Sequence, residues 1–139
     1  MVDVIDETFV VAEPAAVAAA LADPAVWPQL WPGLELTVFQ DRGAQGIRFS
    51  VTGTLVGTSE FWVEPWGDGA LVHYYLRADL TRRGSATEPR TGPAPALVRQ
   101  AIKARNRHCA HLKAGLNVLK DRLEAGRVPG TPRLAHHAP

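Results

Sequence analysis

Arg105 is a permanently charged residue at a position where the sequence predicts an apolar helix face. Apolar side chains recur at spacings of three and four over residues 95–125, and Arg105 interrupts that stripe. A buried guanidinium is costly unless it is paired, so we expect Arg105 to face a water-filled or ligand-filled interior. Its fixed N–H donors suit a carboxylate or keto oxygen of a ligand. The alternative is that the side chain reaches solvent and only its stem touches the core.

Aromatic and small apolar side chains supply the other candidate ligand contacts. Tyr74 lies on the apolar face of a predicted strand, and its buried hydroxyl needs a partner, either a ligand or a core water. Trp27 and Trp31 stand four residues apart in two Trp-Pro pairs, and either line a pocket mouth or wedge a short helix against the sheet. Cys109 is most simply a small buried hydrophobe. The remaining expected ligand contacts are Phe49, Phe61 and Leu112.

No strong catalytic or metal-binding motif is present. The chain lacks a Gly-rich phosphate loop, a nucleophile elbow and a His or Cys cluster with metal-ligand spacing, so we expect no cofactor and no metal. His108 and His111 are three residues apart on the predicted helix, off its apolar stripe, and we expect both on the surface. His136 and His137 in the tail are expected to be inert. The absence of a His paired with a carboxylate on an apolar face favours binding over catalysis.

The elements that position these residues follow from periodicity and turn residues. Period-two alternation is clearest in residues 70–80, and Gly67-Asp68-Gly69 predicts a hairpin turn before it. The predicted strands are 2–12, 34–39, 47–53, 54–65 and 70–80. The predicted helices are 14–21, a short one that starts at Asp23-Pro24, and 95–125, with a mobile polar loop at 81–94. The stripe of the long helix consists of Val98, Ile102, Arg105, Cys109, Leu112, Leu116, Leu119 and Leu123.

The face occupied by Trp62 is open at this stage. Ser59 and Phe61 should share the face of Tyr74, which turns Trp62 to the opposite, partly exposed face. A bulge at Gly57 would reverse that assignment.

Two segments, FVVAEPAAVAAALADPAVWPQLWPGLEL and EPWGDGALVHYYLRA, resemble the START-like (SRPBCC) superfamily, in particular its polyketide cyclase/dehydrase and lipid-transport branch. The resemblance covers residues 2–125. It implies an α+β helix-grip fold, in which a curved antiparallel sheet of about five to six strands wraps around a long C-terminal helix, with two short helices after the first strand. Val17 departs from the pattern, because relatives often carry Trp there, and the middle of the chain is one hairpin shorter than usual.

Length and composition predict one domain, residues 1–126, followed by a disordered tail, residues 127–139. The single cysteine excludes an intrachain disulfide. The acidic N-terminus lacks the features of a signal peptide, and no apolar run is long enough to span a bilayer, so a cytoplasmic location is expected.

Charge is divided between the two halves of the chain. Residues 1–80 carry 11 acidic side chains against 3 Arg, whereas residues 81–139 carry 12 Lys and Arg against 3 acids. Either the basic half makes transient contact with an anionic surface or partner, or a basic helix simply lies across an acidic sheet. Nucleic-acid binding is not expected, because stacking aromatics and a recognisable motif are missing.

The sequence therefore predicts a protein that binds a hydrophobic small molecule, a lipid or a polyketide-like compound, in a cavity between the sheet and the C-terminal helix. The alternative is a polyketide aromatase/cyclase or dehydratase that acts in the same cavity. The resemblance implies both, and two or more titratable groups meeting in the cavity would favour the enzyme. The sequence leaves the oligomeric state open.

Overall fold

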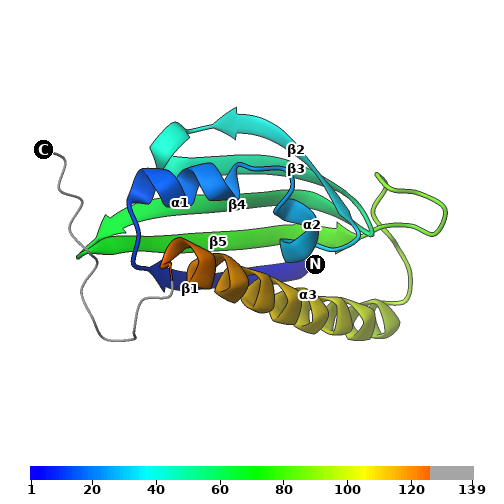
Figure 1. The fold of residues 1–139 in the computed structure, drawn as a ribbon. Coiled ribbons are helices and arrows are strands. Elements are labelled where there is room, and N and C mark those ends of the chain that lie inside the picture. The colour runs from blue at the N-terminus through cyan, green and yellow to red at the C-terminus, as the bar shows by residue number, and fades with distance from the viewer. Residues whose placement is uncertain (126–139) are drawn as a thin grey trace, which may run out of the picture.

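The computed structural model describes residues 1–125, which form one five-stranded antiparallel sheet with helices on one of its faces (Figure 1). The strand order is β1-β5-β4-β3-β2. This confirms the predicted α+β helix-grip architecture. The elements are β1 (Val2–Val10), α1 (Pro14–Leu21), α2 (Trp27–Leu30), β2 (Leu34–Asp41), η1 (Gly43–Gln45), β3 (Gly46–Gly53), β4 (Leu55–Trp66), β5 (Gly69–Leu80) and α3 (Ala94–Leu123).

The alternation of β5 divides the sheet into an inner face under the helices and an outer face. Val72, Tyr74 and Leu76 are buried on the inner face, while Arg77 is exposed on the outer one. The hairpin that was predicted at Gly67-Asp68-Gly69 joins β4 to β5. A local period of two therefore decides which residues of this strand reach the core.

The β4–β5 ladder is continuous from Leu55 to Trp66, so a bulge at Gly57 is wrong. Gly57 pairs in register with Ala78, and a Cβ at Gly57 would lie 2.1 Å from the carbonyl oxygen of Arg77. The glycine thus permits close approach of the β5 backbone rather than an extra residue. Phe61 accordingly shares the face of Tyr74, and Trp62 lies on the outer face, 40% exposed.

The inward stripe of α3 differs from the predicted one in its N-terminal half. The buried residues of α3 are Ala101, Ala104, His108, Leu112, Leu116 and Leu119. Val98, Ile102 and Arg105 are exposed instead. Both stripes keep spacings of three and four from Leu112, so periodicity alone could not separate them.

Packing against α2 explains which stripe of α3 turns inward. A Cβ at Gly115 would lie 2.8 Å from Leu30 Cδ2 and 2.9 Å from the carbonyl oxygen of Gln29, so α2 lies directly on the α3 backbone. The helix also packs along the edge strand β1. Small residues at Ala101 and Ala104 allow this close approach, which larger side chains in their places would prevent.

Backbone hydrogen bonds tie the segment between β5 and α3 to the sheet end. Arg82 N donates to Glu88 O at 2.8 Å, and Gly53 N donates to Ala86 O at 3.0 Å. Its mobility stays a prediction. None of the helices among residues 1–125 is long and apolar enough to cross a membrane. The predicted cap at Gly126 and the tail at 127–139 lie outside the described residues.

Truncation of the inward stripe should destabilise the fold. We expect Leu116→Ala to lower the free energy of unfolding by ~2–5 kcal/mol, because it removes a large buried aliphatic group and leaves a cavity. Val118→Ala on the same helix, at a side chain that is 63% exposed, is the matched control and should change stability by less than ~0.5 kcal/mol. Chemical denaturation measures both, and equal effects would contradict the packing of α3.

Candidate ligand-binding site

An arc of aromatic rings packs between the sheet and the helices. Tyr74 of β5 lies 6.5 Å from Phe61 of β4, centroid to centroid, and Phe61 lies 6.1 Å from Phe49 of β3. Phe49 meets Trp27 of α2 edge-on at 4.9 Å. Trp31, directly after α2, lies 6.3 Å from the imidazole of His108 on α3, centroid to centroid. The arc therefore runs across three strands, over α2 and onto the long helix.

Most of the predicted contact residues meet in this arc. Trp31, Phe49, Phe61 and Leu112 are at most 1% exposed, and Tyr74 is 3% exposed. Trp27 is partly buried and is held in place because its Nε1 donates to Leu21 O at 2.8 Å. Cys109 is partly buried and lies close enough to Tyr74 to influence its pKa. The structure brings these residues together, and their contact with a ligand stays a prediction.

Arg105 does not belong to this group, so its predicted inward position is wrong. Its side chain is exposed, and its Nε donates to the carbonyl oxygen of Asp3 on β1 at 3.0 Å. The alternative, in which the guanidinium reaches solvent, is the one that the structure adopts. The reason is the rotation of α3 that the α2 contact imposes, which turns Ala104 inward in its place.

His108 is the site residue that sequence reasoning missed, because it was predicted to lie on the surface. It is 1% exposed, between Ala104 and Leu112 on the inward stripe. Burial, with smaller contributions from Arg107 and His111, lowers the pKa of His108 to about 4. The imidazole is therefore neutral at neutral pH. Residues four apart on a helix share a face, so extending the series Leu116, Leu112 by four residues would have predicted that His108 is buried.

Several buried polar atoms of the arc lack a hydrogen-bond partner within residues 1–125. They are Trp31 Nε1 and both ring nitrogens of His108, whereas Tyr74 Oη meets no partner at full hydrogen-bond geometry but interacts with the side chains of Thr8 and Asp6. A buried polar group without a partner costs roughly 1–3 kcal/mol, so groups of this kind usually have a water or a ligand as partner. The C-cap residue of α2 and the inward stripe of α3 thus bring unsatisfied polar groups into a largely apolar core.

Tyr74 lies near the border between this interior and a charged pair at the sheet edge. Burial raises the pKa of Tyr74 well above its ordinary value, with the Asp6 carboxylate contributing in the same direction. Burial acts to raise the pKa of Asp6 as well, but the N–H of Glu7, the Tyr74 hydroxyl and the ammonium of Lys113 outweigh it and hold that pKa below its usual value. Lys113 Nζ lies 3.5 Å from Asp6 Oδ2. Tyr74 is therefore a neutral hydroxyl beside a polar edge.

The fully buried residues in the described part of the chain include no Asp, Glu, Lys or Arg. The buried polar side chains are Thr8, Ser59, Thr81 and His108. In residues 1–125 there is also no group of three His, Cys, Asp or Glu side chains that could hold a metal ion. The interior thus offers neutral hydrogen-bonding groups and no countercharge.

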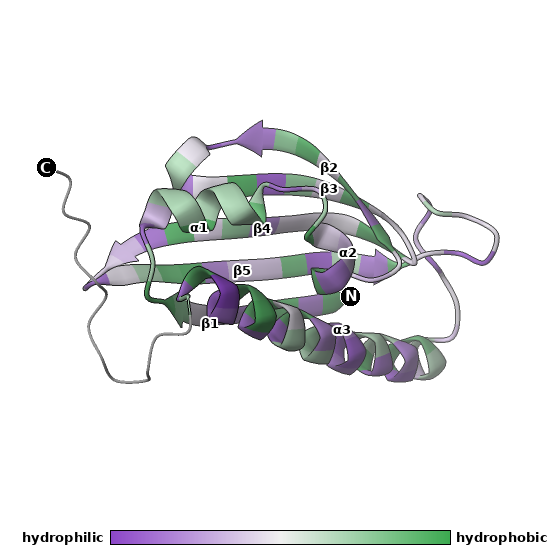
Figure 2. Ribbon diagram, in the orientation of Figure 1, coloured by the Kyte–Doolittle hydropathy of each residue, from purple (hydrophilic) through white to green (hydrophobic). Residues whose placement is uncertain are grey.

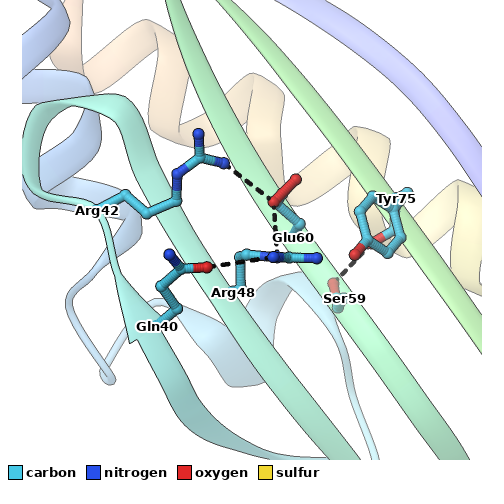
Figure 3. Close-up of polar contacts among 6 residues, drawn as sticks. All are labelled: Gln40, Arg42, Arg48, Ser59, Glu60 and Tyr75. Carbon is cyan, nitrogen blue, oxygen red and sulfur yellow. Dashed lines mark hydrogen bonds and ion pairs between the residues drawn. The ribbon is translucent and has the colours of Figure 1, made fainter.

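A hollow of about 600 Å³ opens on the other side of the sheet, along its outer face. Trp62 stacks on His73 there, with centroids 4.4 Å apart. Figure 3 shows the neighbouring polar cluster, in which Glu60 pairs with Arg42 at 3.4 Å and with Arg48 at 3.0 Å. Of the arc residues only Tyr74 also lines this hollow, so it is not the predicted cavity between sheet and helix, which stays a prediction.

Two solved structures have a similar arrangement of sheet and helices. The solution structure of the Aha1 dimer from Colwellia psychrerythraea is similar with a TM-score of 0.54 and 14% sequence identity, over 92% of this chain and 100% of that one. The di-domain ARO/CYC StfQ from the steffimycin biosynthetic pathway is similar with a TM-score of 0.52 and 15% identity, over 89% of this chain. The chain spans only about half, 51%, of StfQ.

These two likenesses agree with the element order that was predicted and then observed. The chain has a START-like helix-grip fold. At such identities the likeness establishes this fold and no activity. No protein-family model and no curated protein sequence matches the chain. In the START-like fold of this chain, the aromatic arc lies between the sheet and the long helix, which makes it the candidate site.

Burial of His108 should make stability depend on pH. Its pKa is about 4 in the folded chain and near 6.5 when unfolded, so only the unfolded state gains a proton between these values. The contribution of neutral His108 to the free energy of unfolding is complete above about pH 6.5, and it is lost as the pH falls toward 4. We expect unfolding free energy to drop by about 2–3 kcal/mol more between pH 7.5 and 4.5 in the wild type than in His108→Leu.

His111→Leu is the control for this prediction, because His111 is exposed on the same helix. It should keep the wild-type pH dependence. Urea denaturation at a series of pH values measures all three proteins. A pH dependence unchanged by His108→Leu would show that His108 is not buried as the neutral form.

Proposed function

We propose that the chain binds an uncharged, mainly hydrophobic small molecule with keto or hydroxyl groups in the interior between the sheet and α3. The observation that carries this proposal is the set of buried polar atoms on Trp31 and His108 that lack a partner within residues 1–125, together with the buried Tyr74 hydroxyl. Apolar surroundings with a few convergent polar groups are typical of small-molecule sites. A polyketide-like or lipid-like ligand has this character.

The hydrogen-bonding inventory of the site sets the polarity of the ligand. The Trp31 indole can only donate, so it requires an acceptor such as a keto oxygen. Neutral His108 offers one donor and one acceptor, and the Tyr74 hydroxyl can do either. A ligand with both keto and hydroxyl oxygens would satisfy all three side chains.

The absence of a buried cation among residues 1–125 argues against a carboxylate ligand. Arg105 was expected to pair with a carboxylate, but its guanidinium is exposed and bonded to Asp3 O. A carboxylate placed beside Trp31 and His108 would lose its hydration without gaining a countercharge. We therefore favour a phenol or ketone over a fatty acid.

The likeness to StfQ gives limited support to a polyketide-like ligand. The description of StfQ as an ARO/CYC of a biosynthetic pathway concerns that protein, and the shared 15% identity carries only the fold. A cytoplasmic location belongs to the same proposal. Native mass spectrometry of the chain purified from its own host would identify a co-purified ligand.

Catalysis is the second candidate, because two titratable groups, His108 and Tyr74, are buried on the inner face. A neutral imidazole accepts a proton at neutral pH and a phenol donates one, so a cyclase or dehydratase step on a bound polyketide is the form that catalysis would take. Turnover of a reactive poly-β-keto substrate that is lost in His108→Leu, while binding of a stable analogue persists, would favour the enzyme.

Ligand discrimination tests the proposed site. We expect a neutral dihydroxyanthraquinone to bind more tightly than the matching anthraquinone carboxylate, since only the carboxylate adds an uncompensated charge. The affinity for the neutral ligand should fall by about 2–10-fold in each of the variants Trp31→Phe, Tyr74→Phe and His108→Leu. Each variant loses one hydrogen bond between neutral groups, which contributes ~0.5–1.5 kcal/mol. Isothermal titration calorimetry measures these affinities.

Trp62→Phe is the matched control, because Trp62 lies on the outer face of the sheet. It should leave the affinity unchanged. Tighter binding of the carboxylate, or an equal loss in Trp62→Phe, would contradict a neutral ligand in the interior. Each variant is first checked for native stability by thermal unfolding.

A further inference from the structure

The outward face of the N-terminal half of α3 carries a row of exposed cations. Arg99, Lys103 and Arg107 follow at intervals of four residues, and all three are exposed. Such spacing places them on one side of the helix. The sequence has no acidic residue between Pro89 and Lys120. No neighbouring acid on the helix therefore neutralises the row.

Three other cations on α3, Lys113, Lys120 and Arg105, are engaged by the sheet edge or by a nearby carboxylate. Lys113 pairs with Asp6, Lys120 pairs with Glu124, and Arg105 binds Asp3 O. Within residues 1–125, by contrast, no carboxylate lies within ion-pair distance of Arg99, Lys103 or Arg107. The helix thus contacts the acidic strand β1 from Arg105 onward, whereas Arg99, Lys103 and Arg107 keep free positive charge.

Two aliphatic side chains are exposed beside the cations. Val98 is 56% exposed and Ile102 is 53% exposed, one helical turn apart. A shallow hollow of about 420 Å³ adjoins them and is lined by Ala96, Arg99, Gln100, Ile102 and Lys103. Figure 2 shows hydrophobic and hydrophilic residues interleaved along this part of α3. Apolar and positive groups therefore share one surface.

The segment between β5 and α3 adds cations at the same end of the molecule. Arg90 Nη1 donates to Gln100 Oε1 at 2.6 Å and so fastens the segment to α3. Arg82 pairs with Glu88, whereas Arg83 is exposed and has no carboxylate within ion-pair distance in the described part of the chain. Figure 1 shows this segment projecting beside the first turns of α3.

We propose that this end of the molecule, with Arg99, Lys103, Arg107, Val98 and Ile102 at its centre, docks reversibly on an anionic lipid bilayer. Cations attract the protein to a negatively charged surface, and exposed aliphatic side chains beside them enter the boundary between headgroups and acyl chains. Nucleic-acid phosphates would engage the cations but leave Val98 and Ile102 in water. Charge complementarity together with apolar exposure therefore favours a membrane surface.

Vesicle co-sedimentation of the full chain without added ligand tests the proposal independently of the interior site. We expect binding to vesicles of phosphatidylcholine and phosphatidylglycerol in equal parts, little binding to phosphatidylcholine alone, and loss of binding as salt is raised. Arg99→Gln and Lys103→Gln should each weaken partitioning roughly fivefold, the equivalent of ~1 kcal/mol per cation. Ile102→Ser should weaken it by about tenfold.

Two matched controls separate docking from general effects of charge and apolarity. Arg77→Gln removes an exposed cation from the outer sheet face, and Val118→Ser removes a side chain that is 63% exposed on the C-terminal half of α3. Both should partition like the wild type. Equal binding to both vesicle types, or equal loss in the controls, would overturn the proposal. So would binding to duplex DNA that matches vesicle binding and is insensitive to Ile102→Ser.

Discussion

The contact of α2 with the bare backbone of α3 at Gly115 is the constraint on which the rest of the structure depends. Leu30 and Gln29 approach α3 so closely that no side chain fits between them at this position. This contact sets the rotation of α3 about its own axis. It turns Ala104 and His108 toward the sheet and leaves Arg105 outside, beside β1. The chemistry of the interior is a consequence of that rotation.

An interior of this composition combines apolar packing with unsatisfied polar groups. The rings of Phe49, Phe61 and Trp31 are fully buried, and such burial is the main favourable term in folding. The nitrogens of His108 and Trp31 Nε1 work against it, since each loses hydration without a protein partner in residues 1–125. Buried polar groups without partners lower the free energy of unfolding. A neutral ligand that bound only the folded chain and hydrogen-bonded to them would raise it again.

Charge in this molecule is separated by position as well as by sequence. The acidic strand β1 receives Lys113 and Arg105 from the middle of α3, so part of the charge asymmetry serves folding. No ion pair forms between those acids and Arg99 or Lys103, which precede Arg105 on the helix. Only part of the basic helix therefore lies along the acidic strand, and the charge asymmetry serves folding in that part alone.

The sequence by itself determined the elements, their order and the inner face of the sheet. Alternation in β5 placed Tyr74 inward, the Gly67-Asp68 turn fixed the hairpin, and the Trp-Pro pairs marked the short helix that carries Trp27 and Trp31. These features are encoded locally, in periods of two or in turn residues, so they can be read without knowing the neighbours.

Only the tertiary structure decided which side of α3 meets the sheet. One stripe through Leu112 continues to Cys109 and Arg105, and another continues to His108 and Ala104, with the same spacings. The apolar content of the sequence favoured the first, but the fit of α2 against Gly115 selected the second. Shape at a helix–helix contact has no periodic signature in the chain. Only packing could therefore show that neutral His108, and not charged Arg105, lies in the interior.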